Sequence, residues 1–492
     1  MKLSRNNSVG MGSAGRWPAV FGVPPNTSGD TGWKNQTVFL ATQPDGRRRV
    51  GDDSTRAACS PRSTASLRLR TILFICALPF CLWAAEFADV SPAANWDNLP
   101  PATADANDWP WWRGPTLNNV AAANQQPPLR WSETKNVRWR VALPGRGHAT
   151  PCVRGQQIFL PGGDAKAVWL LCLDRETGNK LWQTEIYRGE FAKVHPDNSP
   201  VSATAACDGE RVYVAYQSKG AVNVAALSLD GKIVWNKIAA AYESIQGYSA
   251  SPALYKSAVI VPTDGSTGNK LTALHRQTGE VVWRSTMKQV VESYASPLVA
   301  RVAGRDQLFL IGGQNTRSYD PNTGKLLWEC DGPADFCAAT VAFNDDTVFS
   351  TAGYPQKGLL AIRADGSSDV SQTHLRWKSD KKAGYVPSPI YCGGLLYAVS
   401  DTGLMRCHNP ANGKVIWEHE LKAPFYSSPV IVGERIYLFD RKGKGYVFKT
   451  GREAALLATN TLPDGVFATP VILGGRLYVR THRDLFCLEE KR

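Results

Sequence analysis

The sequence of 492 residues predicts an all-β protein that folds as an eight-bladed β-propeller of four-stranded antiparallel blades. Three observations support this prediction. A phrase with a period of about 40–54 residues occurs eight times. Each copy holds four short runs of β-branched and aromatic residues between turn residues, which is typical of strands. A strand-like segment upstream of the first copy matches the strand that the last copy lacks.

Each repeat opens with a small residue, a Ser-Pro or Thr-Pro step in most copies, and a β-branched run, a pattern that indicates the innermost strand of a blade. The openings are HATPCV (148–153), SATAAC (202–207), SASPAL (249–254), YASPLV (294–299), CAATVAF (337–343), PSPIYC (387–392), SSPVIV (427–432) and FATPVI (467–472).

Most repeats close with a Thr-Gly or related turn followed by a tryptophan. A tight turn needs a residue that tolerates positive φ, which glycine does without steric cost. The indole offers a large apolar area, so we expect it to pack on the neighbouring blade, with ligand stacking as the less favoured alternative. These structural residues are Trp139, Trp182, Trp235, Trp283, Trp328, Trp377, Trp417, Gly178, Gly279, Gly324 and Gly413.

The last repeat ends at FCLEE (486–490), before its outer strand. The segment NVRWRVAL (136–143) lies upstream of the first repeat and carries Trp139 at the tryptophan position. We therefore expect the N-terminal strand to complete the C-terminal blade, which closes the ring and pairs an otherwise exposed edge.

The N-terminal region reads as a leader rather than as part of the fold. The basic run SLRLR (66–70), the apolar run ILFICALPFCLW (72–83) and the small residues after it predict a Sec-type signal peptide over 66–88. The apolar run is shorter than the roughly 20 residues that a spanning helix needs. Phe80 precedes Cys81 where a lipobox needs a small residue, so no lipid anchor is predicted.

Four segments follow from this reading. Residues 1–65 are an extension that is either disordered or the product of a misassigned start, 66–88 the signal peptide, 89–130 a lead-in and 131–492 the propeller. We expect a periplasmic or extracellular monomer whose membrane association is peripheral at most.

The net charge of +13 does not indicate nucleic-acid binding. Residues 1–85 hold 11 Lys and Arg against 4 Asp and Glu, so about half of the excess belongs to the leader. The remaining charges are interspersed, without the basic block that a nucleic-acid site shows.

The turns of the repeats resemble the PQQ (pyrroloquinoline quinone) enzyme repeat, whose pattern is A-x-D-x-x-T-G-x-x-x-W. The first copy matches it except for cysteine at the alanine position, through Cys172, Asp174, Thr177, Gly178 and Trp182. The segments DWPWWRGP (108–115) and 131–151 resemble the lead-in of secreted PQQ-like propellers of planctomycete-type bacteria. The resemblance covers roughly residues 108–492 and implies the fold more strongly than an activity.

Two groups share this repeat. Quinoprotein alcohol dehydrogenases hold PQQ and Ca²⁺ in the central funnel, usually with a disulfide between adjacent cysteines, and this chain has no adjacent cysteines. BamB-type scaffolds have eight similar blades and no cofactor. The resemblance therefore implies a non-catalytic binding or protein-interaction scaffold. The alternatives are a quinoprotein dehydrogenase with a divergent site, and binding of a polysaccharide or peptide at the propeller mouth.

Eight cysteines follow the leader. Cys172, Cys407 and Cys487 occupy one repeat position and are expected to be free core thiols. Cys330 and Cys337 flank the connection between the fourth and fifth blades and can pair or stay free. No CxxC or CxxxH spacing indicates zinc, and no metal ligand is assigned.

The loops that enter the innermost strands are rich in aromatic residues. A ring of aromatics with an arginine and two histidines can bind a planar cofactor, a sugar or a peptide, whereas the favoured alternative is packing of each aromatic at its strand entrance. No catalytic residue is assigned, because no nucleophile elbow, HExxH or P-loop is present. The candidate ligand-binding residues are Arg146, His148, His195, Tyr248, Glu292, Tyr294, Tyr385, Tyr426 and Phe467.

Overall fold

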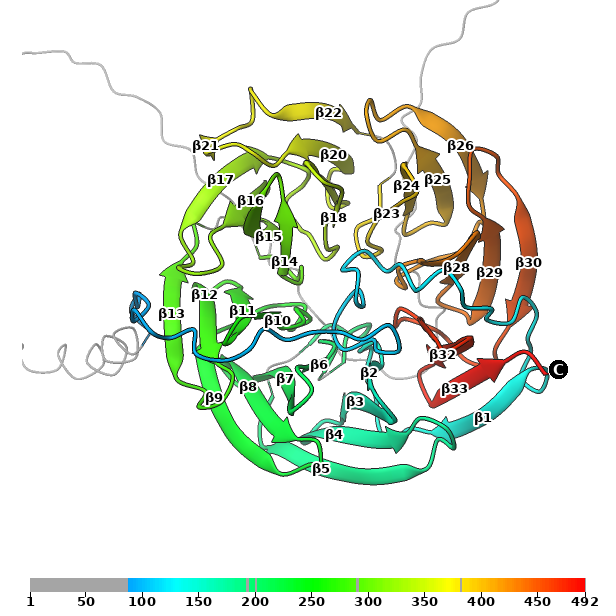
Figure 1. Cartoon of the computed structure of the whole chain (residues 1–492), viewed down its shortest axis with the longest axis horizontal. Helices are drawn as coiled ribbons and strands as arrows, with labels where there is room; N and C mark the ends of the chain where they lie inside the picture. The colour runs from blue at the N-terminus through cyan, green and yellow to red at the C-terminus, as the bar shows by residue number, and fades with distance from the viewer. Residues whose placement is uncertain (1–86, 192–193, 200, 289–291, 381–382, 492) are drawn as a thin grey trace, which may run out of the picture. The chain divides into compact units, whose positions relative to one another are not determined.

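A computed structural model describes residues 87–191, 194–199, 201–288, 292–380 and 383–491. Eight sheets stand around a central channel, which confirms the predicted eight-bladed propeller (Figure 1). The described residues hold no helix that is long and apolar enough to span a membrane. The predicted extension and all but the end of the signal peptide lie outside the described residues.

Every blade runs from a short innermost strand to a longer or more exposed outer strand. The first three blades are β2 (Cys152–Arg154), β3 (Gln157–Gly163), β4 (Ala167–Asp174) and β5 (Lys180–Arg188); β6 (Ala206–Cys207), β7 (Arg211–Ser218), β8 (Ala221–Ser228) and β9 (Ile233–Ala241); and β10 (Ala253–Tyr255), β11 (Ala258–Asp264), β12 (Gly268–His275) and β13 (Val281–Thr286). The fourth and fifth are β14 (Leu298–Val302), β15 (Arg305–Gly312), β16 (Asn315–Tyr319) and β17 (Leu326–Asp331); and β18 (Ala342–Phe343), β19 (Thr347–Ala352), β20 (Gly358–Arg363) and β22 (Leu375–Ser379). The last three are β23 (Ile390–Cys392), β24 (Leu395–Val399), β25 (Leu404–His408) and β26 (Val415–Glu420); β27 (Val430–Val432), β28 (Arg435–Phe439), β29 (Lys444–Lys449) and β30 (Leu456–Thr461); and β31 (Val471–Leu473), β32 (Arg476–Arg480), β33 (Asp484–Glu489) and β1 (Val137–Ala142).

The ring closes as predicted, because the N-terminal strand β1 pairs antiparallel with the C-terminal strand β33. Trp139 lies opposite Cys487, the same register that joins Cys172 to Trp182 and Cys407 to Trp417 in complete blades. The N-terminal strand therefore takes the place of the missing outer strand.

The fourth blade departs from the four-stranded plan. The two-residue strand β21 (Ser368–Asp369) adds parallel to β17, with Trp328 opposite Ser368. It belongs to an insertion between β20 and β22, and Val370 anchors that insertion with a side chain that is buried in the core of the fourth blade.

The repeated tryptophans lie on the turn of the next blade. The Trp139 indole N–H donates to the Arg175 carbonyl at 3.2 Å. A Cβ atom at Gly178, whose φ is +74°, would lie 2.8 Å from the Trp139 ring, so only glycine fits beneath the indole. The same ring-on-glycine contact joins Trp182 to Gly231, Trp235 to Gly279, Trp283 to Gly324 and Trp377 to Gly413. Trp417 donates to the Gly451 carbonyl at 2.9 Å, and Trp328 instead donates to the side chain of Gln307 within its own blade. The energetic role of these contacts stays a prediction.

The described cysteines are all free thiols. Cys172, Cys407 and Cys487 are buried, as expected. The possible pairing of Cys330 with Cys337 is not formed, since each sulfur lies against a backbone carbonyl of its own loop, that of Asp331 or of Ala334.

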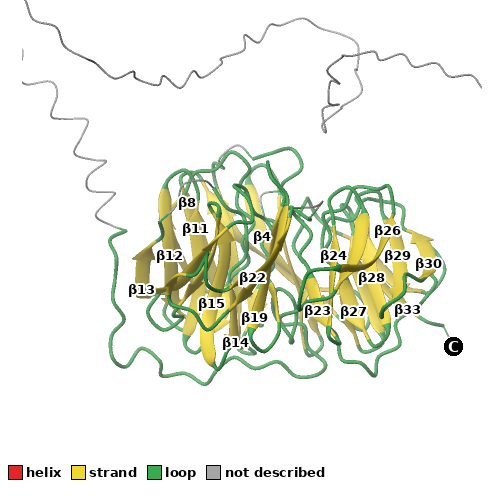
Figure 2. Ribbon diagram, turned by 90° about the horizontal axis from the view of Figure 1, so that it is seen from above, coloured by secondary structure: helices red, strands yellow, loops and turns green. Residues whose placement is uncertain are grey.

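The lead-in crosses one face of the ring, and we call this end of the channel the base (Figures 1 and 2). Val90 pairs with Arg284 of the third blade, Trp109 with Val153 of the first, and Val120 with Ile431 of the seventh. The opposite end, where the connecting loops enter the innermost strands, is the mouth.

A candidate ligand site at the channel mouth

A belt of hydroxyl groups lines the waist of the channel. At most junctions the Ser or Thr at the start of an innermost strand accepts a hydrogen bond from the backbone N–H of the corresponding residue in the preceding blade. The pairs are Thr150 with Thr204 (3.0 Å), Thr204 with Ser251 (2.9 Å), Ser251 with Ser296 (2.9 Å), Thr340 with Ser388 (2.9 Å), Ser388 with Ser428 (2.9 Å) and Ser428 with Thr469 (3.1 Å). The repeated Ser/Thr in the repeat openings was the signal for this belt, but its role was not predicted from the sequence.

The lead-in closes the base below this belt. The Trp112 indole N–H donates to Thr340 Oγ1 at 2.8 Å. Arg113 is buried, and its guanidinium donates to the Pro389 carbonyl at 2.7 Å and the Leu117 carbonyl at 2.9 Å. Trp112 is thus the floor of the cavity that opens at the mouth, and this cavity has a volume of about 200 Å³.

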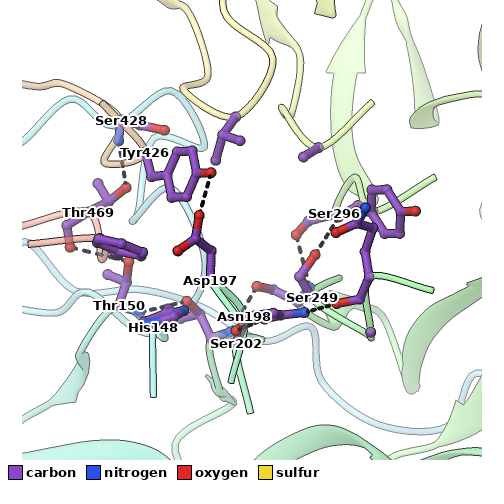
Figure 3. Close-up of a pocket in the computed structure, with 18 of the residues that line it drawn as sticks. His148, Thr150, Asp197, Asn198, Ser202, Ser249, Ser296, Tyr426, Ser428 and Thr469 are labelled. Atoms are coloured by element: carbon purple, nitrogen blue, oxygen red, sulfur yellow. Dashed lines mark hydrogen bonds between the residues drawn. The ribbon is translucent and has the colours of Figure 1, made fainter. Parts of the chain in front are cut away.

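The structure brings six of the nine candidate residues to this cavity, and Figure 3 shows part of its wall. They are His148, His195, Tyr294, Tyr385, Tyr426 and Phe467. Five of them stand three or four residues before the proline of a repeat opening, which explains why a repeat pattern could find them, and His195 was found in the longer loop before the second blade.

Arg146, Tyr248 and Glu292 do not line the cavity. Tyr248 is buried between the second and third blades, with its ring 5.4 Å from that of Tyr242. Glu292 accepts hydrogen bonds from the hydroxyls of Tyr294 and Ser244, each at 2.9 Å. Arg146 is exposed on the rim and donates to the Pro196 carbonyl at 3.3 Å.

One wall of the cavity is built from charged and aromatic groups of the seventh, eighth and first blades. The Arg441 guanidinium lies over the rings of Tyr426 and Phe467, 4.2 and 4.7 Å from their centroids. Its Nη2 atom forms a 2.9 Å ion pair with Asp197, and the Tyr426 hydroxyl lies 3.4 Å from the same carboxylate. Figure 3 shows Asp197 pointing at Tyr426 across the cavity.

His148 and His482 complete this wall. The Phe467 ring lies 4.8 Å from the His148 ring and 4.5 Å from the His482 ring. Arg441 and His482 were not predicted, because they come from the hairpins between the second and third strands of their blades, which carry no repeat signature at the sequence level.

The electrostatic environment of the wall disfavours added positive charge. Burial, and next to it the positive charges of Arg480 and His482, hold the pKa of His148 well below its usual value. His148 Nε2 is buried and has no hydrogen-bond partner among the described residues. Burial also lowers the pKa of Arg480 to about 9, and this guanidinium donates to the carbonyls of Pro161 and Ala149 at 2.8 and 3.2 Å.

The opposite side of the mouth holds a buried carboxyl group. Asp264 ends β11, is buried, and has two carboxyl oxygens without hydrogen-bond partners among the described residues. Burial raises its pKa well above the usual value, against the opposing charge of Arg317.

The donor set is poor in metal ligands. The described residues contain no cluster of three or more His, Cys, Asp or Glu side chains that could hold a metal ion. Among the described residues that line the cavity, Asp197 is the one carboxylate, and it already forms an ion pair with Arg441.

The fold and this channel define a PQQ-like β-propeller whose base is closed by its own N-terminal segment. The chain belongs to the family described as outer membrane protein assembly factor BamB, whose model matches residues 118–263, 170–316, 267–369 and 356–454.

Relatives from two species carry the same description. The chain is 21% identical over 337 residues to outer membrane protein assembly factor BamB of Yersinia pestis, covering 68% of this chain and 71% of that protein. It is 24% identical over 358 residues to BamB of Burkholderia pseudomallei, covering 69% and 84%. Among solved structures, quinohemoprotein alcohol dehydrogenase from Comamonas testosteroni has a TM-score of 0.58 at 15% identity, covering 83% of this chain and 84% of that one, which shows a shared fold alone.

Proposed function

We propose that this protein is an exported, non-catalytic binding scaffold that engages a protein partner through the mouth of the propeller. Its family and the BamB relatives are named for outer membrane protein assembly, which supports a protein partner and a periplasmic location. The predicted signal peptide agrees with export.

The closed base is the observation that carries this proposal. Trp112 and Arg113 fill the base, and the belt hydroxyls bond to neighbouring blades. A cavity open at one end can hold a projecting group of a partner. Within the described part of the chain, the unpartnered Nε2 atom of His148 lies at the mouth.

The quinoprotein alternative fits these residues poorly. Ca²⁺ takes six to eight oxygen ligands, several of them carboxylates. The lining offers the Asp197 carboxylate, which Arg441 neutralises, while Asn198 Oδ1 accepts hydrogen bonds from Ser199 and Ser202. Arg441 lies over one face of Tyr426 and one face of Phe467, so these two rings offer less surface for stacking of a planar quinone.

Two measurements on the exported full chain test the proposal. We expect no thermal shift and no dye-linked dehydrogenase activity after addition of PQQ and Ca²⁺, because the donor set does not match. PQQ-dependent reduction of the dye would overturn the proposal.

The second measurement locates the partner contact. A photo-reactive amino acid at Tyr354, which is 58% exposed on a mouth hairpin, should give partner adducts in the native cells. The control position is Leu181, which is 50% exposed on the outer strand β5. Adducts from Leu181 alone would show that the mouth is not the binding face.

A further inference from the structure

We propose that the basic wall of the mouth, formed by Arg441, His148, His482, Tyr426 and Phe467, binds a carboxylate of an acidic polypeptide segment. This inference rests on the proposed scaffold function and names the chemistry that the scaffold recognises.

Positive groups converge on this wall from three blades. Arg441 comes from the hairpin between β28 and β29, Arg480 from the end of β32, and Arg146 from the loop before β2. His148 and His482 lie among these arginines with lowered pKa values, so they add hydrogen-bonding groups rather than charge. Among the described residues, three acids lie near them. Asp197 is paired with Arg441, and Asp464 is paired with Arg483 and close enough to act on His482. Asp401 is close enough to act on Tyr426. Positive charge is in excess, so an added anion would be attracted to the wall.

Two groups of the wall can donate a hydrogen bond to an added carboxylate. His148 Nε2 is buried in the cavity lining without a partner among the described residues. Arg441 uses Nη2 for Asp197, and a guanidinium has five N–H donors in a fork that matches a carboxylate. A carboxylate placed between them satisfies both groups, and an unpaired buried donor is costly to leave.

The aromatic rings of the wall favour a peptide over a polysaccharide. Sugars are held by stacking on open aromatic faces, but Arg441 lies on the faces of Tyr426 and Phe467, and both histidine rings pack around Phe467. Recognition here falls to charge and hydrogen bonds. The rim also offers exposed apolar side chains, Ile245 at 70% and Tyr354 at 58%, to residues that flank the acid.

Asp197 already neutralises part of the Arg441 charge that a ligand carboxylate would meet. It approaches from the loop between the first and second blades, 2.9 Å from the guanidinium. A ligand therefore competes with a resident carboxylate, so removing the charge of Asp197 should strengthen binding. A mutation that merely damaged the mouth would weaken it, and this difference in sign separates the two cases.

The probe is a fluorescent, amidated peptide, acetyl-Gly-Phe-Glu-Phe-Gly-amide, whose binding to the full chain is followed by anisotropy. We expect a Gln-for-Glu twin to bind at least tenfold more weakly. A peptide's C-terminus is a second source of a carboxylate, so the Gln peptide is also made with a free C-terminus. If this peptide binds more tightly than the amidated Gln peptide, the result supports the carboxylate site. A polyuronate that binds as tightly as the acidic peptide would overturn the peptide assignment.

Three variants complete the test. Arg441→Gln should weaken the acidic peptide at least tenfold, and Asp197→Asn should tighten it severalfold. Arg301→Gln removes the same charge from a side chain of β14 that is 70% exposed and takes no part in the wall, and it should leave the affinity unchanged. Weaker binding by Asp197→Asn, or unaltered binding by Arg441→Gln, would overturn the inference. If the peptide tests fail while Tyr354 still gives partner adducts, the scaffold function stands and the carboxylate site alone is wrong.

Discussion

A buried arginine lies at each end of the channel, and the two arginines have different roles. Arg113 at the base and Arg480 at the mouth are both buried, each donates to two backbone carbonyls, and burial lowers the pKa of each to about 9. At the base, Arg113 belongs to the lead-in, and the lead-in buries its guanidinium against the blades. At the mouth, Arg480 lies behind a wall that faces an open cavity.

This difference shows that residue type alone does not distinguish a structural site from a binding site. A buried guanidinium that donates to carbonyls has a structural role where the rest of the chain covers it. Where a cavity lies beside such a guanidinium, its positive electrostatic potential attracts an anionic ligand. Substitutions at the base should therefore change stability without changing binding, and substitutions at the mouth should change binding.

The largest effect is expected at the base, for Trp109→Ala. Trp109 is fully buried, and its ring lies where a Cβ atom at Gly114 would be 2.6 Å away, so it fills the space under the lead-in. Truncation of a buried tryptophan should lower the free energy of unfolding by about 3–5 kcal/mol, measured by urea denaturation. Peptide affinity of the folded protein should stay at the wild-type value. A loss of affinity in Trp109→Ala would mean that the base shapes the mouth.

A matched pair of substitutions tests the two guanidinium groups directly. Arg113→Met and Arg480→Met each leave two buried carbonyls without their donor, which should cost about 1–3 kcal/mol of stability in either case. The acidic peptide should bind several times more weakly to Arg480→Met and equally well to Arg113→Met. Equal binding by both variants would show that Arg480 adds no useful potential to the wall.

The buried Asp264 carboxyl predicts that the stability of the protein decreases as the pH rises. The pKa of Asp264 is raised in the folded protein, so the folded state keeps a proton that the unfolded chain releases above about pH 4. Wild-type stability therefore falls as the pH rises from 4. Asp264→Asn removes this loss, and it should be more stable than wild type by about 2 kcal/mol at pH 8 and equally stable at pH 4. Denaturant midpoints at the two pH values measure it. An equal midpoint at pH 8 would contradict the raised pKa.

The repeat made the fold predictable and the site only partly so. The Trp-turn phrase, the eight openings and the orphan strand around Trp139 are local patterns, so ring closure by β1 and β33 followed from them. Five mouth residues were found because they stand three or four residues before the proline of a repeat opening, and His195 was found in a long connecting loop. Arg441 and His482 lie in hairpins without a repeat signature, and their approach to Asp197 and Phe467 depends on the curvature of the ring, which no local pattern encodes. The strand β21 was missed because an insertion of polar residues gives no strand signal.

The smallest effect compares two histidines, His148 at the mouth and His408 at the base end of β25. Burial lowers the pKa of both in the folded protein. The unfolded chain takes up protons below about pH 6.5 that these folded histidines do not, so stability is full above that pH and falls as the pH drops. The free energy of unfolding should fall between pH 7 and pH 5.5 by about 1 kcal/mol less in each His→Gln variant than in wild type. Urea denaturation at the two pH values measures this difference.

The acidic peptide should separate these two histidines. His148 faces Arg480, His482, Arg146, Arg441 and the nearby Asp197, and a bound carboxylate would favour its protonated form. His408 instead lies 3.1 Å through Nδ1 from the Gly413 carbonyl, away from the cavity lining. Saturating peptide should therefore flatten the pH dependence of wild type and of His408→Gln, and it should leave that of His148→Gln unaltered. An equal flattening in His148→Gln would assign the linked proton to His482, whose pKa burial also lowers and whose ring lies 5.8 Å from that of His148.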